Sequence, residues 1–415
     1  MRLVRKEIVA CMKNLPLLFW NVLSVLVWGI LILFPASGAK SVLVWLGVCC
    51  VVPRVLSARG KREAVGIGWC IGLYLAACSL SAFFSVDVAF SLRQLVKLIE
   101  NVAAFGVLYH LLLRPGGLSR GLVSFGMAFG AIACLDVAFM LVQMARGTII
   151  ITDGRWFDSL LGYPTIAAGM YGVGFLVIVS HFFQSKVVWQ RSGWFVCLLA
   201  ISVLLYRLQT RSALAGILIG LGVFMMRAPL RRSIRLGIIA AAVAVMLAML
   251  AVPNVFRERI LSRSLSDRRE IWQDVQTILQ TGYGEQPWRR LVGFGYGHRI
   301  FERSHVSLPA AQRRAMRVYD HTHNVFIEAH FQTGLLGLLA FVALLAAIII
   351  KAARNGMVGL AHQRQISAAG VLAAFVHLLV YAQFSLFFSY LPILLFWLLA
   401  ACLLVSASPD ALREG

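Results

Sequence analysis

Apolar runs of about 20 residues, separated by short polar breaks, recur along nearly the whole chain. A bilayer core about 30 Å thick requires roughly 20 apolar residues per helix, so each run is long enough to cross it. The runs lack the two-residue alternation of a membrane β-barrel. Hydrophobic residues make up 60% of the chain and charged residues 13%, against about 45–50% and about 25% in soluble domains. We therefore predict an all-α polytopic membrane protein.

We expect about twelve transmembrane helices, nine before one large loop and three after it. The first part is residues 1–252, the loop is 253–329, and the last part, with a terminal tail, is 330–415. The predicted spans are 15–34, 41–57, 64–84, 92–113, 118–145, 164–183, 193–206, 211–227, 233–252, 330–351, 366–384 and 387–406. The seventh and eighth are short, with a polar break between them.

Basic residues gather in alternate loops. With the N-terminus in the cytoplasm, the short outer loops contain few of them, namely Lys40, Arg93, Arg146, Arg155, Arg207 and Arg211. The positive-inside rule then places both termini inside and the long loop outside. The net charge of +22 fits cytoplasmic loops and anionic lipid headgroups. No soluble basic domain is present to bind nucleic acid.

The loop at 253–329 contains twelve arginines and no lysine. Arginine grips phosphate oxygens with a planar fork, whereas lysine is a point charge. The loop therefore suggests phosphate handling, although a general bias towards arginine remains an alternative. Some of these arginines must also pair with the acidic residues of the loop.

Residues 266–281 predict a helix that begins with a capping box at Asp267 and Glu270. Arg268 lies in its first turn, where an anion would meet both its guanidinium and free backbone N–H groups; a surface arginine is the alternative. The glycines of LVGFGYGH, 291–298, indicate a tight turn. Residues 307–319 are compatible with a basic amphipathic helix on the membrane surface or with a solvated face.

The stretch DHTHN, 320–324, places two histidines, an aspartate and an asparagine at the mouth of a membrane helix. Polar groups there are costly unless they have a partner or face water. His321 and His323 are candidates for metal binding, for a structural hydrogen bond, or for general-base catalysis near neutral pH. The first outer loop, PASGAK, has no acid and no DxD motif occurs. If the substrate is a diphosphate, arginines must therefore replace a metal, and we expect neither a metal nor a cofactor.

These segments together resemble the O-antigen ligase and polymerase superfamily. HNVFIEAHFQTGLLG is similar to its HN…E…G..G signature, RREIW to its RxxxW motif, and VGFGYG to the turn that follows. TRSALAG is similar to its SRxxxxG segment, with threonine in place of the first serine, and GRWFDSLLGYPTIAAG to an earlier R…G…P…A element. The resemblance runs from about residue 150 to 400.

The resemblance implies a GT-C-like, metal-independent, inverting glycosyltransferase at the periplasmic face of a Gram-negative inner membrane. Its donor would be an O-antigen glycan on undecaprenyl diphosphate, and its acceptor a sugar hydroxyl of lipid A–core in lipopolysaccharide biosynthesis. His323 would be the general base. The residues expected to bind the donor diphosphate are Arg211, Arg268, Arg155 and Arg207, with His321, Asn324, Arg269 and Glu328 in support.

Two alternatives remain open from the sequence. An O-antigen polymerase or a protein O-oligosaccharyltransferase would use similar chemistry with another acceptor. A non-catalytic transporter of lipid-linked sugars would need polar groups spread through its spans, whereas polarity here concentrates in one outer loop.

Overall fold

A computed structural model describes most of the chain. The described residues are 22–34, 38–57, 65–114, 116–152, 155–156, 158–240, 266–306, 321–354 and 362–406. The basic segment at 307–319, Asp320 and most of the ninth predicted span lie outside them.

The described residues form long helices, as the apolar runs predict. The long helices are α2 (Gly38–Ser57), α3 (Val65–Phe83), α4 (Val88–Leu112), α5 (Gly117–Ala145), α6 (Pro164–Gln184), α7 (Val188–Leu208), α8 (Arg211–Arg227), α15 (Val325–Arg354), α16 (His362–Ala382) and α17 (Tyr390–Ser406). Residues 22–33 and 232–240 are also helical. The remaining elements are α11 (Ser266–Glu285), α12 (Arg289–Val292), α13 (Ile300–Val306) and the two-residue strands β1 (Ile151–Thr152) and β2 (Arg155–Trp156).

Within the described residues, seven helices are long and apolar enough to cross a membrane. Three shorter apolar helices are Val22–Leu33, Lys40–Cys49 and Tyr390–Ser406. The polytopic, helical class is therefore confirmed, while the count of about twelve stays a prediction. The polar break at Gln209 and Thr210 does separate two helices, α7 and α8.

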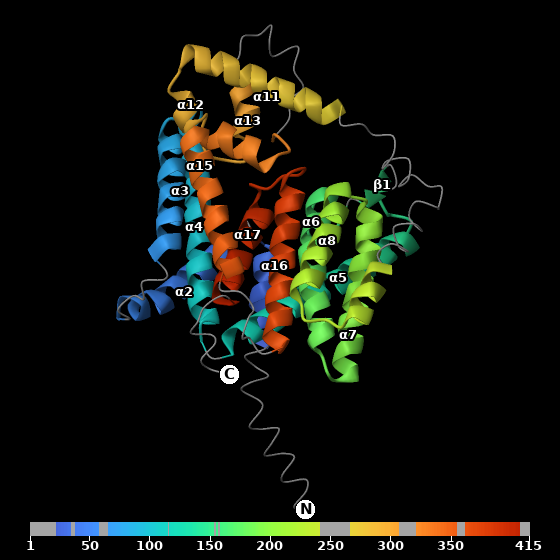
Figure 1. Cartoon of the computed structure of the whole chain (residues 1–415). Helices are drawn as coiled ribbons and strands as arrows, with labels where there is room; N and C mark the ends of the chain where they lie inside the picture. The colour runs from blue at the N-terminus through green and yellow to red at the C-terminus, as the bar shows by residue number, and fades with distance from the viewer. Residues whose placement is uncertain are drawn as a thin grey trace, which may run out of the picture.

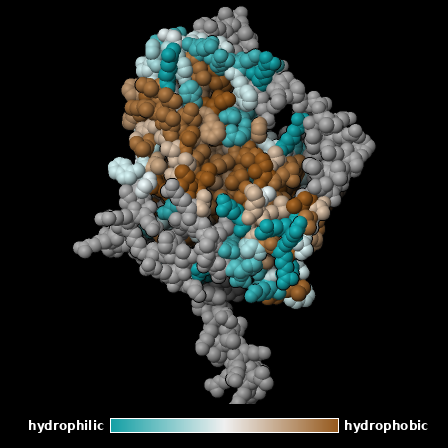
Figure 2. Space-filling view, in the orientation of Figure 1, coloured by the Kyte–Doolittle hydropathy of each residue, from teal (hydrophilic) through white to brown (hydrophobic). Residues whose placement is uncertain are grey.

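The helices form one bundle with α15, α16 and α17 between two flanks (Figure 1). On one flank α15 packs against α3, and α17 packs against α4; on the other, α16 packs against α6 and α8. Figure 2 shows hydrophobic side chains gathered over the middle of this face and hydrophilic ones towards its two ends. This banding is what a bilayer-spanning surface requires.

Helix α11 lies across one end of the bundle, above α12 and α13 (Figure 1). The predicted helix at 266–281 is confirmed and extends to Glu285. Its apolar stripe is buried: Ile271, Val275 and Ile278 are at most 2% exposed and pack in a small core with Phe294 and Phe331. This separate core holds α11 to the glycine turn and to α15.

Lys40 corrects the predicted loop assignments. It lies in α2 and not in a short outer loop, and it is 3% exposed. Its Nζ lies 3.6 Å from Glu100 Oε2 and donates to Asn101 Oδ1 at 3.2 Å. Both partners lie on α4, some 60 residues along the chain, so hydropathy around Lys40 could not reveal them.

Candidate active site

The histidine segment 321–324 is a short turn that leads into α15. Asn324 ends the turn and caps the helix: its Oδ1 accepts hydrogen bonds from the backbone N–H groups of Phe326 at 3.0 Å and Ile327 at 3.1 Å. Asparagine is among the preferred residues for this position because its side chain satisfies donors that the first helical turn leaves open. The asparagine thus sets the direction in which the preceding histidines leave the helix.

His323 has a backbone φ of 56°, in the left-handed region. Few residues other than glycine adopt this conformation, so the surrounding contacts must hold it. His323 Nδ1 lies 3.1 Å from His321 Nε2, and the ring centroids are 3.9 Å apart. Histidines two apart diverge on a regular helix; here the left-handed residue turns the second ring back onto the first.

Glu328, near the start of α15, fixes the histidine segment through a buried hydrogen bond. It is 4% exposed, and its carboxylate oxygens accept from Thr322 N and from Gln332 Nε2, both at 2.7 Å. The two groups that donate to the carboxylate are thus a backbone amide and a glutamine side chain. Glu328 therefore acts on His323 through the backbone of its neighbour, Thr322.

The RxxxW segment meets the histidine segment directly. Trp272 Nε1, on α11, donates to the backbone oxygen of Thr322 at 3.1 Å. Arg268 lies one helical turn before Trp272, so the two share a face of α11 by register. The side chain of Arg268 lies outside the described atoms, and Arg269 is exposed. Two motifs 50 residues apart in sequence are thus joined at the residue beside His323.

The glycine turn supports the same part of α15. Phe294 N and Gly295 N donate to the backbone oxygens of Phe331 and Gln332, and Gly297 N donates to Gln332 Oε1 at 3.2 Å. Gly334 interrupts the helix with φ 63° and ψ −165°. A Cβ there would lie 2.3 Å from the backbone of Leu291, so only glycine fits this crossing. The predicted tight turn is confirmed, and it packs against the interrupted helix.

Arg207 and Arg211 flank the break between α7 and α8. Arg207 lies partly buried in the last turn of α7, and Arg211 is the exposed first residue of α8. Thr210, between them, donates through its hydroxyl to the backbone oxygen of Pro164 at 3.4 Å, which ties the break to the start of α6. The two arginines therefore lie at the two ends of a break that is fixed against the start of α6.

The segment between α16 and α17 bridges the arginine break and the histidine segment. Ser385 Oγ lies 3.0 Å from Ser212 Oγ, next to Arg211. Gln383 Oε1 accepts from Asn324 Nδ2 at 3.4 Å, next to His323. Residues 383–389 carried no predicted role, because their contacts lie on helices that are far away in sequence.

Arg155 lies in β2, which pairs with β1 and contacts α7. The structure does not describe its side chain.

Two residues of α5 that the sequence did not single out hold the segment around β2. Asp136 accepts from Ser159 Oγ at 2.7 Å, Leu160 N at 2.9 Å and Tyr171 Oη at 2.5 Å. Gln143 accepts from Trp156 Nε1 at 2.8 Å and donates to Asp158 at 2.9 Å. A lone acid in an apolar run was the signal available for Asp136.

An apolar groove of about 360 Å³ lies between α11 and α15. Its walls include Trp272, Leu279, Phe326 and Leu338, with His330 at one side. Trp272 therefore contributes to this groove and also binds the histidine segment.

The described residues contain no group of three or more His, Cys, Asp or Glu placed to share one metal ion.

This combination of a histidine turn, an RxxxW helix, a glycine turn and an arginine break agrees with a known family over one part of the chain. Residues 195–342 match the Wzy_C family, described as O-antigen ligase. The matched stretch, 148 of the 415 residues, is similar to the O-antigen ligase family. The match supports membership of the O-antigen ligase superfamily and confirms the resemblance seen in the sequence.

The matched stretch begins within α7 and ends within α15. It covers every candidate site residue from the sequence analysis except Arg155. Comparison with curated proteins gives no match. The roles of the individual residues therefore rest on the geometry described above and on the chemistry that it allows.

Proposed function

We propose that this protein is a membrane glycosyltransferase that moves a glycan from undecaprenyl diphosphate to a sugar hydroxyl of lipid A–core. The reaction would take place at the periplasmic face of the inner membrane, in lipopolysaccharide biosynthesis. The observation that carries the proposal is the position of His323. It lies in a left-handed turn of the stretch that matches the O-antigen ligase family, and its neighbours Thr322 and Asn324 are hydrogen-bonded to α11, to α15 and to the α16–α17 segment.

His323 acts as the general base in this proposal. When the proton of His323 sits on Nδ1, that atom donates to His321 Nε2, and the Nε2 lone pair of His323 is the proton acceptor. The acceptor hydroxyl gives its proton to His323 as its oxygen forms a bond to the anomeric carbon. The bond from that carbon to the diphosphate oxygen breaks, and undecaprenyl diphosphate leaves with the electron pair. General-base help of this kind typically contributes about 10²–10⁴-fold.

The arginines are proposed to stabilise the charge on the departing diphosphate. Arg207 and Arg211 flank the α7–α8 break, Arg155 lies on a strand that contacts α7, and Arg268 shares a face with Trp272. Guanidinium groups bind phosphate oxygens bidentately, so they can take the place of a metal in this role. The apolar groove beside Trp272 offers a surface for the lipid part of a substrate.

The decisive test measures donor binding and transfer in parallel for His323→Ala, with purified protein, lipid-linked glycan and lipid A–core. We expect transfer to fall at least about 100-fold while donor binding is retained. A parallel fall of binding and transfer would make His323 a binding or structural residue. The lipopolysaccharide of a deletion strain distinguishes the acceptor class, because loss of a ligase accumulates lipid-linked polymer whereas loss of a polymerase leaves single-unit caps.

A further inference from the structure

A second cationic site lies on the other flank of the bundle, at Lys97. This lysine is in α4, nine residues after the helix begins at Val88, which places it about 14 Å along the helix axis. Its Nζ donates to Tyr390 Oη at 3.0 Å and lies 4.3 Å from the centroid of that ring. No carboxylate of the described residues lies within ion-pair distance of it.

The neighbouring charges do not neutralise Lys97. Lys40 and Glu100 form their own pair, and Glu100 also accepts from Ser41 Oγ at 2.9 Å. One net positive charge therefore remains on Lys97, inside a helix that is apolar enough to span a membrane. Charged residues at such positions are costly, and they occur mainly where they bind ions, substrates or partners.

Lys97 lines a small cavity between α4, the glycine turn and α17. Its polar lining also includes Lys40, Gln94, Asn101, His298 and Tyr390, and apolar side chains complete it. The cavity has an accessible volume of about 20 Å³. This volume accommodates roughly one water-sized group. A single charged oxygen at the end of a larger ligand meets that limit.

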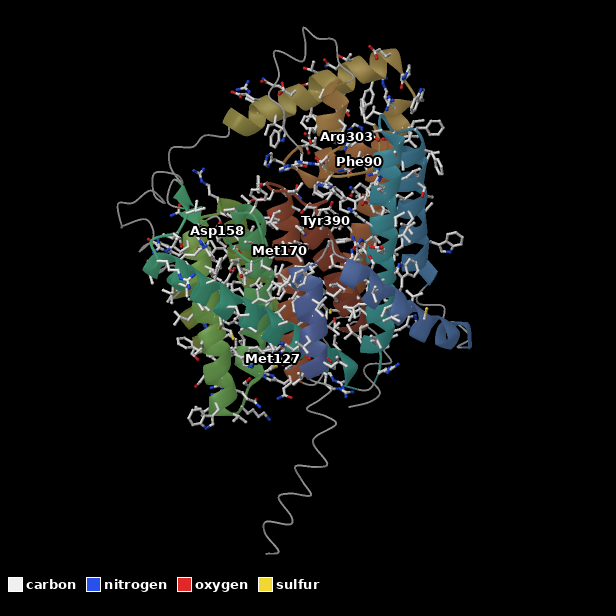
Figure 3. All side chains as sticks on the ribbon, turned by 180° about the vertical axis from the view of Figure 1, so that it is seen from behind. Phe90, Met127, Asp158, Met170, Arg303 and Tyr390 are labelled. Atoms are coloured by element: carbon white, nitrogen blue, oxygen red, sulfur yellow. The ribbon has the colours of Figure 1, made fainter. Side chains whose placement is uncertain are left out.

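The glycine turn joins this cavity to the histidine segment. Tyr296 and Gly297 form part of its wall, and Gly297 N donates to Gln332 Oε1. Gln332 in turn donates to Glu328, which binds Thr322 beside His323. In Figure 3, Tyr390 lies below Phe90 and Arg303 and to the right of Asp158. The histidine segment is thus hydrogen-bonded in series to the glycine turn and, through Asn324 and Gln383, to the α16–α17 segment.

We infer that the Lys97 cavity binds an anionic group of the acceptor, a phosphate or a carboxylate close to the sugar that provides the attacking hydroxyl. The inference rests on the proposed function, in which the arginine flank takes the donor diphosphate. Lysine suits this cavity because its ammonium is a compact charge with three donors, two of which remain after the bond to Tyr390. The acceptor would then be held at α4, and the donor at the α7–α8 break.

The test compares three variants in transfer assays with purified protein. Lys97→Met keeps the length of the side chain and removes its charge; we expect the acceptor KM to rise roughly tenfold, the usual effect of losing one charge-assisted hydrogen bond, with the donor KM unchanged. Lys97→Arg should retain most of the affinity. Arg93→Met, one turn earlier on α4 at an exposed position, is the matched control and should behave like wild type. A rise in the donor KM alone would overturn the assignment.

Modified acceptors identify the anion. Removing the phosphates of lipid A–core, or esterifying its carboxylates, should raise the acceptor KM of wild type by the same factor as Lys97→Met. The modification that does so should have no further effect on Lys97→Met. If each modification raises the acceptor KM of Lys97→Met by the same factor as that of wild type, Lys97 does not bind these groups and the inference is wrong.

A chemical experiment on wild type tests the site even if Lys97→Met does not fold or the proposed function is wrong. Amine-selective acylation of Lys97, followed by mass spectrometry, should be slowed by intact acceptor and not by acceptor that lacks the critical anion. This result would stand even if Lys97→Met failed to fold. If wild type transferred glycan to no acceptor, the proposed function would fail, whereas the protection experiment would still decide whether the cavity binds an anion; equal acylation with and without acceptor would refute it.

Discussion

Replacing Glu328 with glutamine tests how the histidine segment is held. Three buried contacts run in series: Thr322 N to Glu328, Gln332 Nε2 to Glu328, and Gly297 N to Gln332 Oε1. Thr322 N and Gly297 N are fixed donors at the two ends. In wild type each of the three donors has an acceptor, because both carboxylate oxygens of Glu328 accept hydrogen bonds. With glutamine at 328, every choice of amide orientation leaves one contact with two donors facing each other.

The expected cost is that of one buried donor without an acceptor, about 1–3 kcal/mol, or roughly 5- to 150-fold in the population of the ordered segment. Glu328, Gln332 and Thr322 are at most 4% exposed, so water cannot easily replace the lost acceptor. We expect Glu328→Gln to lower both thermal stability in detergent and the transfer rate. Glu285→Gln, at an exposed position on α11, is the control and should change neither.

The swapped double variant, Glu328→Gln with Gln332→Glu, should restore much of the loss. Glutamine 328 would then accept from Thr322 N and donate to the carboxylate at 332, whose second oxygen accepts from Gly297 N. Thermal melts and initial transfer rates of wild type, Glu328→Gln, Gln332→Glu and the double variant form a double-mutant cycle. Wild-type behaviour of Glu328→Gln, or a double variant worse than the single one, would refute the hydrogen-bond reasoning.

Three further predictions concern the chemistry. The transfer rate of wild type should rise with pH as the imidazole loses its proton, because only neutral imidazole accepts one; the rise should be absent from the residual activity of His323→Ala and kept in the milder His321→Ala. Arg211→Ala and Arg268→Ala should weaken donor use far more than Arg299→Ala, a control at an exposed position. Lysine at 211 or 268 should keep only part of the donor use, and full activity of the variant with lysine at both positions would contradict the diphosphate assignment. Transfer should survive EDTA, and loss on chelation that one added metal reverses would overturn the replacement of a metal by arginine.

The amino-acid sequence by itself determined the class of the protein and several local elements. Runs of about 20 apolar residues require membrane helices wherever they occur, because unpaired backbone groups are too costly in hydrocarbon. The stripe of Ile271, Val275 and Ile278 has the spacing of a helix that buries one face, and it does so. The glycines at 293–297 predicted a tight turn because few other residues adopt a positive φ.

Tertiary structure alone decided which polar groups share a site. Hydropathy sums over neighbours in sequence, whereas the hydrogen bonds that matter here join distant segments: Trp272 to Thr322, Ser212 to Ser385, and Lys97 to Tyr390, the last pair 293 residues apart. A polar side chain in an apolar run looks costly until its partner is known. Once the helices pack, the same side chains become the fixed contacts of a site, because a buried donor or acceptor is stable only where another element supplies its partner.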